Sequence, residues 1–204
     1  MSDTIIRSLD ELDAHYGVPS PASLAKETDH LTAHYRALVE ASPFVLVASV
    51  ASEGVDCSPR GDPAGFVVVE DDKTLLMPDR LGNNRTDTLR NIVRDPRVAL
   101  LFMIPGIGET LRVAGTAEID TAPELLERFA INGKPPRSVV RIHIQTVYFQ
   151  CQKALVRSGL WDPSKHIDRK SLPSTGEMLA ARMADFDGAK YDADYPERMK
   201  QTMY

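Results

Sequence analysis

Phe44-Val-Leu-Val-Ala-Ser-Val-Ala51 is a short apolar run rich in β-branched residues, with Pro43 before it and a Glu-Gly turn after it. A run of this length and composition predicts a buried strand. Before Pro43, in residues 8–41, apolar side chains recur at helical spacings that Pro19 and Pro21 interrupt, which predicts two leading helices. The change of period at Phe44 therefore marks the start of a β-rich body.

Beyond this run the pattern continues mainly as strands. The expected strands are 55–60, 65–69, 74–77, 97–104, 111–119 and 139–149, and the expected helices are 86–94 and 124–130. In the last strand the apolar residues change phase, which predicts a bulge near Gln145-Thr146. This order favours a mainly β fold, a small antiparallel barrel with peripheral helices. A doubly wound α/β fold fits poorly because the strands do not alternate with helices.

The length of 204 residues fits one domain with ample sequence for a core. We expect residues 1–42 to form N-terminal helices, 43–150 the barrel, and 151–204 a tail that wraps around a body. Hydrophobic residues make up 43% of the chain and charged residues 26%. Both values are close to the averages of soluble globular proteins, so neither disorder nor a fibrous architecture is indicated.

Charge and apolar run length limit the expected partners and location. The net charge of −5 argues against broad electrostatic contact with nucleic acid or an anionic membrane surface. The longest apolar runs are less than half as long as a membrane-spanning helix. The chain begins Met-Ser-Asp, without a basic segment and an apolar core, which predicts a cytoplasmic protein without a signal peptide. Cys57 and Cys151 lack metal-ligand spacing, and we expect both to be buried or partly buried reduced thiols.

The segment Pro78-Asp79-Arg80-Leu81-Gly82-Asn83-Asn84-Arg85 joins a predicted strand to a predicted helix. Helix N-termini expose unpaired N–H groups that favour anions, and Gly82 allows close approach to the backbone. Arg80 and Arg85 add positive charge, so the segment predicts a phosphate cradle. Asn84 has the alternative role of a helix N-cap. Neither a P-loop nor a Rossmann glycine pattern occurs in the chain.

Two further segments carry groups suited to a planar anionic ligand. Ser58 and Arg60 lie at a predicted strand end, where the guanidinium fork suits a phosphate or a carbonyl-rich ring edge. The alternative interpretation is a surface arginine beside a turn. Lys153 and Arg157 are four residues apart and share one face if this segment is helical, with Trp161 close behind. Trp161 has the alternative role of closing the core.

Motifs for nucleophilic catalysis and metal binding are missing from the sequence. No Gly-x-Ser-x-Gly elbow occurs, and neither cysteine lies in a Cys/His setting, which argues against a hydrolase. Asp29, His30 and His34 find no further ligand with matching placement and are expected to be solvent-facing polar residues. We therefore assign no catalytic residue and no metal site.

Four motifs occur together along the chain. They are Ser-Pro-Arg-Gly-Asp-Pro-Ala-Gly-Phe (58–66), Pro-Asp-Arg-Leu-Gly-Asn-Asn-Arg (78–85), Glu-Thr-Leu-Arg-Val-Ala-Gly (109–115) and Lys-Ala-Leu-Val-Arg-Ser-Gly-Leu-Trp (153–161). In combination they resemble the bacterial branch of the pyridoxamine 5′-phosphate oxidase-like FMN-binding split-barrel proteins. The resemblance covers nearly the whole chain.

The resemblance implies a homodimer of six-stranded split β-barrels with FMN in two equivalent clefts at the subunit interface. It implies that Arg157 and Trp161 are contributed across the dimer, so that the tail acts as a clamp. The implied cofactor-binding residues are Ser58, Arg60, Pro78, Asp79, Asn83, Asn84, Arg85, Thr110, Arg157 and Trp161.

One departure from the family pattern bears on the substrate. Vitamin B6 oxidases of this family hold the pyridoxal phosphate product with an Arg-Leu-His-Asp-Arg type C-terminal motif. The nearest segment here is His-Ile-Asp-Arg-Lys (166–170), which matches poorly. We therefore expect an FMN-dependent oxidoreductase whose substrate the sequence does not identify.

Two alternatives stay open. One is a split-barrel protein that binds F420 or haem. Haem would need an axial ligand, and His143 is the only histidine on a predicted strand. The alternation of apolar residues around it does not decide on which face of the strand its side chain lies. The other is a flavin-binding sensor or storage protein without turnover.

Overall fold

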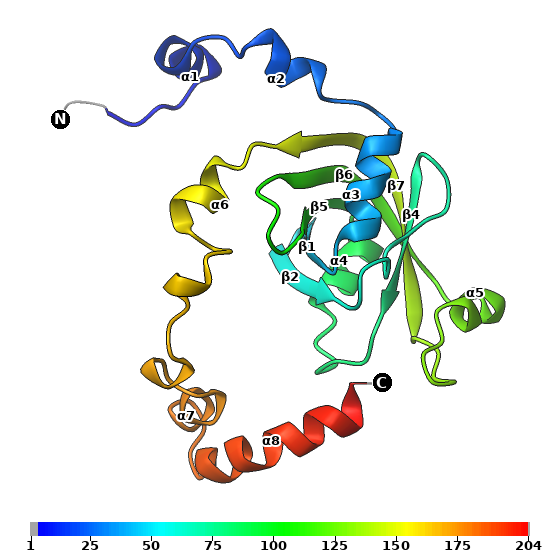
Figure 1. The fold of residues 1–204 in the computed structure, drawn as a ribbon, viewed down its shortest axis with the longest axis vertical. Helices are drawn as coiled ribbons and strands as arrows, with labels where there is room; N and C mark the ends of the chain where they lie inside the picture. The colour runs from blue at the N-terminus through cyan, green and yellow to red at the C-terminus, as the bar shows by residue number, and fades with distance from the viewer. Residues whose placement is uncertain (1–3, 204) are drawn as a thin grey trace.

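The computed structural model describes residues 4–203. Its strands form one antiparallel sheet in the order β2-β1-β5-β6-β7-β4-β3 (Figure 1). The strands are β1 (Phe44–Ala51), β2 (Gly54–Gly61), β3 (Val68–Val69), β4 (Thr74–Asp79), β5 (Arg97–Met103), β6 (Thr110–Asp120) and β7 (Ser138–Gln150).

Eight α-helices are found within this described part of the chain. They are α1 (Leu9–Tyr16), α2 (Pro21–Ala25), α3 (Ala33–Ala41), α4 (Asp87–Arg94), α5 (Pro123–Arg128), α6 (Lys153–Ser158), α7 (Thr175–Ala180) and α8 (Gly188–Thr202). Short 3-10 turns at Pro163–Lys165 and Arg169–Ser171 connect α6 to α7.

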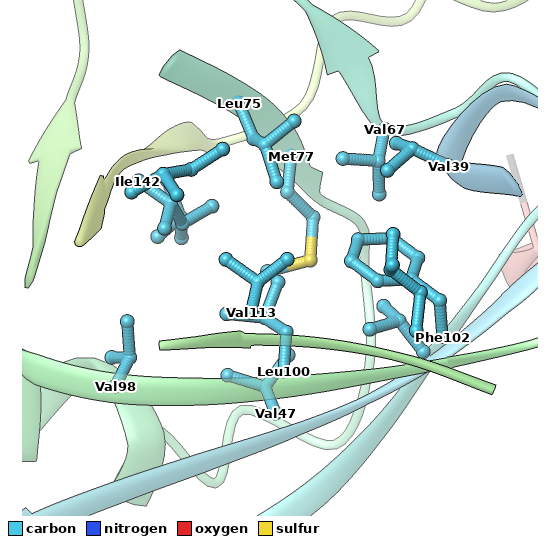
Figure 2. Packing of buried hydrophobic residues seen from close by; sticks show 14 of the residues in the cluster. Val39, Val47, Val67, Leu75, Met77, Val98, Leu100, Phe102, Val113 and Ile142 are labelled. Carbon is cyan, nitrogen blue, oxygen red and sulfur yellow. The ribbon is translucent and has the colours of Figure 1, made fainter. Parts of the chain in front are cut away.

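The sheet curls around one apolar core. Three strands separate β1 from β4 in the sheet, yet Val47 and Met77 belong to the same buried cluster. Figure 2 shows Met77 pointing into this cluster beside Val113. Helix α3 adds Val39, whose side chain is fully buried. Burial of these side chains from both ends of the sheet stabilises the curled form, because each buried CH₂ contributes about 0.8 kcal/mol.

The predicted mainly β architecture is confirmed, and the strand count is corrected. The family resemblance implied six strands, whereas the described residues hold seven. Val68–Val69 pairs with Leu75 and Leu76 and adds a short strand at one edge. No hydrogen-bonded ladder within residues 4–203 joins the two edge strands β2 and β3, so the backbone pairing forms an open sheet.

Two local predictions also need correction. Only the last two residues of the predicted 65–69 strand are paired, because Gly65 has φ +87° and Phe66 N donates to Pro63 O in a turn. Three helices lead into the sheet instead of two. The expected second helix is divided because Thr28 forms a backbone bridge with Val147 between α2 and α3.

The predicted bulge in the last strand is confirmed. Ala114 pairs with Thr146 and Gly115 pairs with Ile144, so one extra residue lies between these partners in β7. The bulge brings the His143 carbonyl close to Gly115, where an added Cβ would lie 2.0 Å from that oxygen. This close approach explains why glycine occupies the middle of an otherwise regular strand.

The two ends of the chain lie outside this core. Figure 1 shows α1 and α2, and then the chain from α6 to α8, extending away from the sheet, with α8 turning back toward it. Helices α1, α2, α6 and α8 contain no buried residue. None of the helices formed by residues 4–203 combines the length and the apolar character that crossing a membrane requires.

The expectation that the cysteines are buried or partly buried is wrong. Cys57 and Cys151 are both exposed free thiols. Cys57 alternates with the half-buried Asp56 and Ser58 on β2 and lies on the outward face of this edge strand. Cys151 follows the last residue of β7. A thiol behaves as a small apolar group, but its burial depends on which face of the strand is covered.

Candidate functional site

A pocket lies where the C-terminal end of β4 meets the loop that leads into α4. Its volume is about 140 Å³. The lining residues are Arg60, Asp79, Arg80, Leu81, Gly82, Asn83, Asn84, Arg85, Thr86, Leu89, Arg137 and Ser138. The structure thus brings together five of the ten site residues expected from the sequence, Arg60, Asp79, Asn83, Asn84 and Arg85.

The loop before α4 has a left-handed residue at its centre. Asn84 has φ +59°, a conformation that asparagine tolerates better than other non-glycine residues. Asn83 Oδ1 accepts from Arg85 N at 2.9 Å, and Asn84 Oδ1 accepts from Arg137 Nη1 at 2.7 Å. These contacts fix the loop so that its side chains line the pocket.

Helix α4 begins without a side-chain cap. Its N-cap residue is Thr86, which makes no side-chain cap hydrogen bond, so Asn84 is not the N-cap. The first N–H groups of the helix therefore lack a partner from the cap and remain suited to an anion. Arg85 extends beside this end with a side chain 78% exposed and pairs with Asp87.

Arg60 and Asp79 form an ion pair inside the pocket. The distance from Arg60 Nη2 to Asp79 Oδ1 is 3.6 Å, and the two side chains are only 27% and 20% exposed. Burial raises the pKa of the Asp79 carboxyl above its ordinary value, while the nearby Arg60 and Arg137 guanidinium groups oppose this rise. The pocket is therefore lined by four arginines and one half-buried carboxylate.

Arg80 anchors the loop to two other parts of the fold. Its Nε donates to Asp62 Oδ2 at 2.9 Å, and its Nη1 donates to the Phe129 carbonyl at 2.6 Å. The Asp62 side chain is 1% exposed. Because the Arg80 head group already has two partners, it positions the loop, and its charge is less available to a ligand than that of Arg85.

Ser58 and Pro78 take supporting positions. The Ser58 hydroxyl donates to Asp56, whose Oδ2 also accepts from Thr88 Oγ1 at 2.5 Å. This contact ties β2 to the first turn of α4. Pro78 is buried in β4 and lines a neighbouring pocket together with Arg60. Neither residue lines the pocket that contains Asn84.

The remaining three expected site residues lie apart from this pocket. Thr110 begins β6, and Arg157 lies on α6, so the segment that starts at Lys153 is helical. Trp161 Nε1 donates to the Ile107 carbonyl in the β5–β6 loop at 2.9 Å. Trp161 therefore joins the C-terminal segment to that loop and does not close the core. We call Thr110, Arg157 and Trp161 the distal group.

The model of the family described as pyridoxamine 5′-phosphate oxidase matches residues 31–151. This match spans more than half of the 204-residue chain. The chain belongs to the pyridoxamine 5′-phosphate oxidase family. The match contains the whole sheet and the pocket, and it ends at the first residue after β7.

Several solved structures are similar to the chain. HupZ from Group A Streptococcus is 22% identical, with 57% of this chain and 91% of HupZ covered at a TM-score of 0.47. An F420 reductase is 21% identical, with 59% and 98% covered at a TM-score of 0.42. An FMN-binding protein from Syntrophomonas wolfei is 12% identical, with 56% and 82% covered at a TM-score of 0.43. No curated protein matches the sequence.

Arg137 and Ser138 are pocket residues of this family member that the sequence analysis missed. They precede and begin β7, and Ser138 pairs with Asp79 across the sheet. No local motif marks them, because the break at 133–136 reads only as a turn. Only the pairing of β4 with β7 in the folded chain brings these two residues to the pocket.

Other polar clusters do not extend the site. Asp29 contacts His30 and Lys73 at 2.9 and 2.8 Å, which holds its pKa at about 2. His143 is exposed, and its Nε2 lies 3.3 Å from Glu118 Oε1 on the outer face of the sheet. No group of three or more His, Cys, Asp or Glu residues in the part of the chain described is placed to hold a metal ion.

Proposed function

We propose that this family member binds FMN and acts as an FMN-dependent oxidoreductase on a small-molecule substrate. The observation that carries the proposal is the pocket that Arg60, Asn84, Arg85 and Arg137 line together with Thr86, the residue at the uncapped N-terminus of α4. Four of the pocket's residues are arginines, in a protein whose net charge is −5. A local positive site of this kind, in this family, favours a phosphate-bearing cofactor.

The residues of the pocket fit the phosphate end of FMN. Arg85 and Arg137 supply guanidinium donors, and the first N–H groups of α4 supply backbone donors. Arg60 and Asp79 lie at the strand ends and would hold the polar edge of the ring system, since one donates and the other accepts hydrogen bonds. Bound FMN would supply hydride or electron transfer, and the protein would bind it, orient it and exclude water.

The second part of the proposal is a homodimer with the cofactor at the interface. The pocket volume of about 140 Å³ is below the roughly 300–1,000 Å³ of small-molecule sites, so one chain encloses only part of FMN. The distal group lies apart from the pocket of its own chain and would complete the pocket of a second chain. The chain ends also carry large apolar side chains that are largely exposed, among them Leu9, Tyr16, Val156 and Ile167. Exposed apolar surface on extended segments favours burial by a partner.

The decisive experiment is retention of FMN by the purified protein. The absorption spectrum is recorded before and after adding FMN and removing the excess by gel filtration. We expect oxidised-flavin bands at roughly one FMN per chain. A colourless protein that releases all FMN contradicts the proposal, and bands of a deazaflavin or a haem would replace FMN with that cofactor.

The Arg85→Ala variant tests the pocket itself. Loss of a charge-assisted contact to phosphate of about 1.5–3 kcal/mol corresponds to roughly 10–100-fold weaker FMN binding. Arg97→Ala is the matched control, because Arg97 is also exposed and paired to a neighbouring carboxylate but lies outside the pocket. Equal FMN affinity in the two variants would exclude Arg85 from the cofactor site.

The dimer is tested by light scattering coupled to gel filtration. We expect the mass of two chains for the 204-residue protein, and Trp161→Ala should lower FMN affinity if the distal group reaches a second chain. A monomer that retains FMN with unchanged affinity in Trp161→Ala contradicts an interfacial site. Turnover is a separate matter, and a bound flavin that no reductant or substrate reduces at a useful rate would identify a sensor or storage protein.

A further inference from the structure

Helix α4 is attached to the sheet by polar side chains as well as apolar ones. It lies beside β1 and β2 (Figure 1). Thr88 and Asn91 of this helix are only 4% and 7% exposed. Thr88 Oγ1 donates to Asp56 Oδ2 at 2.5 Å, and Asn91 Nδ2 donates to Ser49 Oγ at 3.2 Å. Hydrogen bonds depend on direction as well as distance, so these two contacts orient α4 on the sheet.

Asp56 is the centre of the first of these contacts. The Ser58 hydroxyl lies 3.2 and 3.0 Å from its two carboxylate oxygens, and Thr88 Oγ1 lies 2.5 Å from one of them. An ionised carboxylate only accepts hydrogen bonds, so both hydroxyl protons point toward Asp56. The Ser58 proton is therefore directed at Asp56 and not at a ligand. We call Ser58, Asp56 and Thr88 the Asp56 cluster.

Two features connect the Asp56 cluster with the proposed cofactor pocket. Thr88 is the second residue of α4 and closely follows the pocket residues Arg85 and Thr86. It therefore lies in the turn whose first N–H groups suit an anion. Asp56 also lines a second cavity, of about 260 Å³, together with Arg85 and Asp87. Asp87, and to a smaller extent Asp56, raise the pKa of the Arg85 guanidinium above its ordinary value. The cluster thus acts on both the helix end and Arg85.

Local contacts do not fix this turn relative to the sheet. Thr86 makes no side-chain cap hydrogen bond. Asp87 pairs with Arg85, and Arg90 Nε donates to Thr86 Oγ1 at 3.2 Å, but both contacts are exposed and stay within the turn and its flank. Exposed contacts of long side chains hold geometry weakly. The hydrogen bond to the half-buried Asp56 is therefore the polar contact that ties the turn to β2.

We propose that Asp56 is a positioning residue for the phosphate site and that it sets the preference of the chain for FMN over riboflavin. Riboflavin has the ring system and the ribityl chain of FMN but lacks the phosphate. Only FMN therefore depends on the direction of the α4 N–H groups and of Arg85. Asp56 does not line the cofactor pocket, and it acts through Thr88. The inference rests on the proposed function, because the phosphate site is the one proposed there for FMN.

The test compares FMN with riboflavin on the 204-residue protein freed of flavin, with quenching of flavin fluorescence as the measure of affinity. We expect the ratio of FMN affinity to riboflavin affinity to fall roughly tenfold in Thr88→Val and in Asp56→Ala, because displaced donors lose charge-assisted contacts to the phosphate. Riboflavin affinity should stay within about twofold, since riboflavin has no phosphate to use these donors. Asp56→Asn should keep most of the ratio, because its amide oxygen still accepts from Thr88.

Ser49→Ala is the matched control. It removes the partner of the buried Asn91 amide and so weakens the attachment of α4 by a lost hydrogen bond as well. Ser49 lies outside the cofactor pocket, and its partner lies in the second turn of the helix. We expect this variant to keep the wild-type affinity ratio. Urea unfolding of each variant separates a change in the ratio from a loss of stability.

The outcomes separate this inference from the proposed function. A wild type that retains FMN, with an unchanged affinity ratio in Thr88→Val, overturns the positioning role and leaves the cofactor proposal intact. An equal fall of the ratio in Ser49→Ala also overturns it, since any loosening of α4 would then suffice. A ratio that rises in Asp56→Ala would show that Asp56 only repels the phosphate. A wild type that retains neither flavin overturns the proposed function, and the inference with it.

Discussion

Arg60 Nη2 on β2 lies 3.6 Å from Asp79 Oδ1 on β4, although four strands separate β2 from β4 in the sheet. The curl of the sheet around its core brings these two strand ends together. The ion pair therefore forms only in the folded chain, and both of its residues line the proposed cofactor pocket. Several of the contacts that build this pocket have the same long-range origin.

The first prediction concerns the pH dependence of stability at Asp79. Burial raises the pKa of this carboxyl above its ordinary value of 3.8, so the folded protein holds the proton more tightly than the unfolded chain. The contribution of Asp79 to stability is fully present below pH 3.8 and is lost as the pH rises through the folded pKa. We expect the difference in unfolding free energy, wild type minus Asp79→Asn, to fall over this range. Urea unfolding at a series of pH values measures it, and a flat or rising difference contradicts the assignment.

The second prediction concerns the anchor at Arg80. Arg80→Met keeps the apolar stem and removes the guanidinium group that contacts the nearly fully buried Asp62. Breaking a buried pair from one side costs about 3 kcal/mol, and we expect destabilisation of this size in urea unfolding. Arg128→Met is the control, because its ion pair with Glu70 is more exposed and should contribute less than about 1 kcal/mol. Similar losses in both variants would refute the anchoring role.

The third prediction concerns the bulge at Gly115. In Gly115→Ala the new Cβ would lie 2.0 Å from the His143 carbonyl oxygen, so the backbone of β6 or β7 must shift. Overpacking of this kind costs about 3 kcal/mol. Gly82→Ala is the control for stability, because an added Cβ there meets no atom within 4 Å. Thermal unfolding compares the two, and an equal melting temperature for wild type and Gly115→Ala would contradict the bulge geometry.

The fourth prediction separates conformation from recognition at Asn84. Because Asn84 has φ +59°, Asn84→Ala should unfold more easily than Asn84→Gly by about 1 kcal/mol. Both variants lose the amide that accepts from Arg137 at 2.7 Å. We therefore expect FMN affinity to fall by a similar factor in the two, when flavin fluorescence is used to follow binding. A loss of affinity in the alanine variant alone would assign the effect to the backbone.

The sequence by itself determined those features that depend on near neighbours. Most strands and helices, the bulge near Gln145 and the polar loop after β4 were predicted from local patterns and are confirmed, whereas the 65–69 strand and the number of leading helices were corrected. Local patterns suffice here because apolar alternation, a change in its phase and the residues of a turn can each be recognised within a few consecutive positions. The loop at 78–85 was found for the same reason, since a strand end, glycine and arginines lie together in the chain.

Only the tertiary structure decided which distant residues meet. Arg137 lines the pocket because Ser138 pairs with Asp79, and Cys57 is exposed because it lies on the outward face of β2. Tyr191 and Tyr195 of α8 line a cleft together with the loop 80–83, and Asp192 ties the helix to Gly176 of α7. These relationships depend on sheet curl, strand register and helix packing. No short pattern encodes such contacts, because they join residues far apart in the sequence.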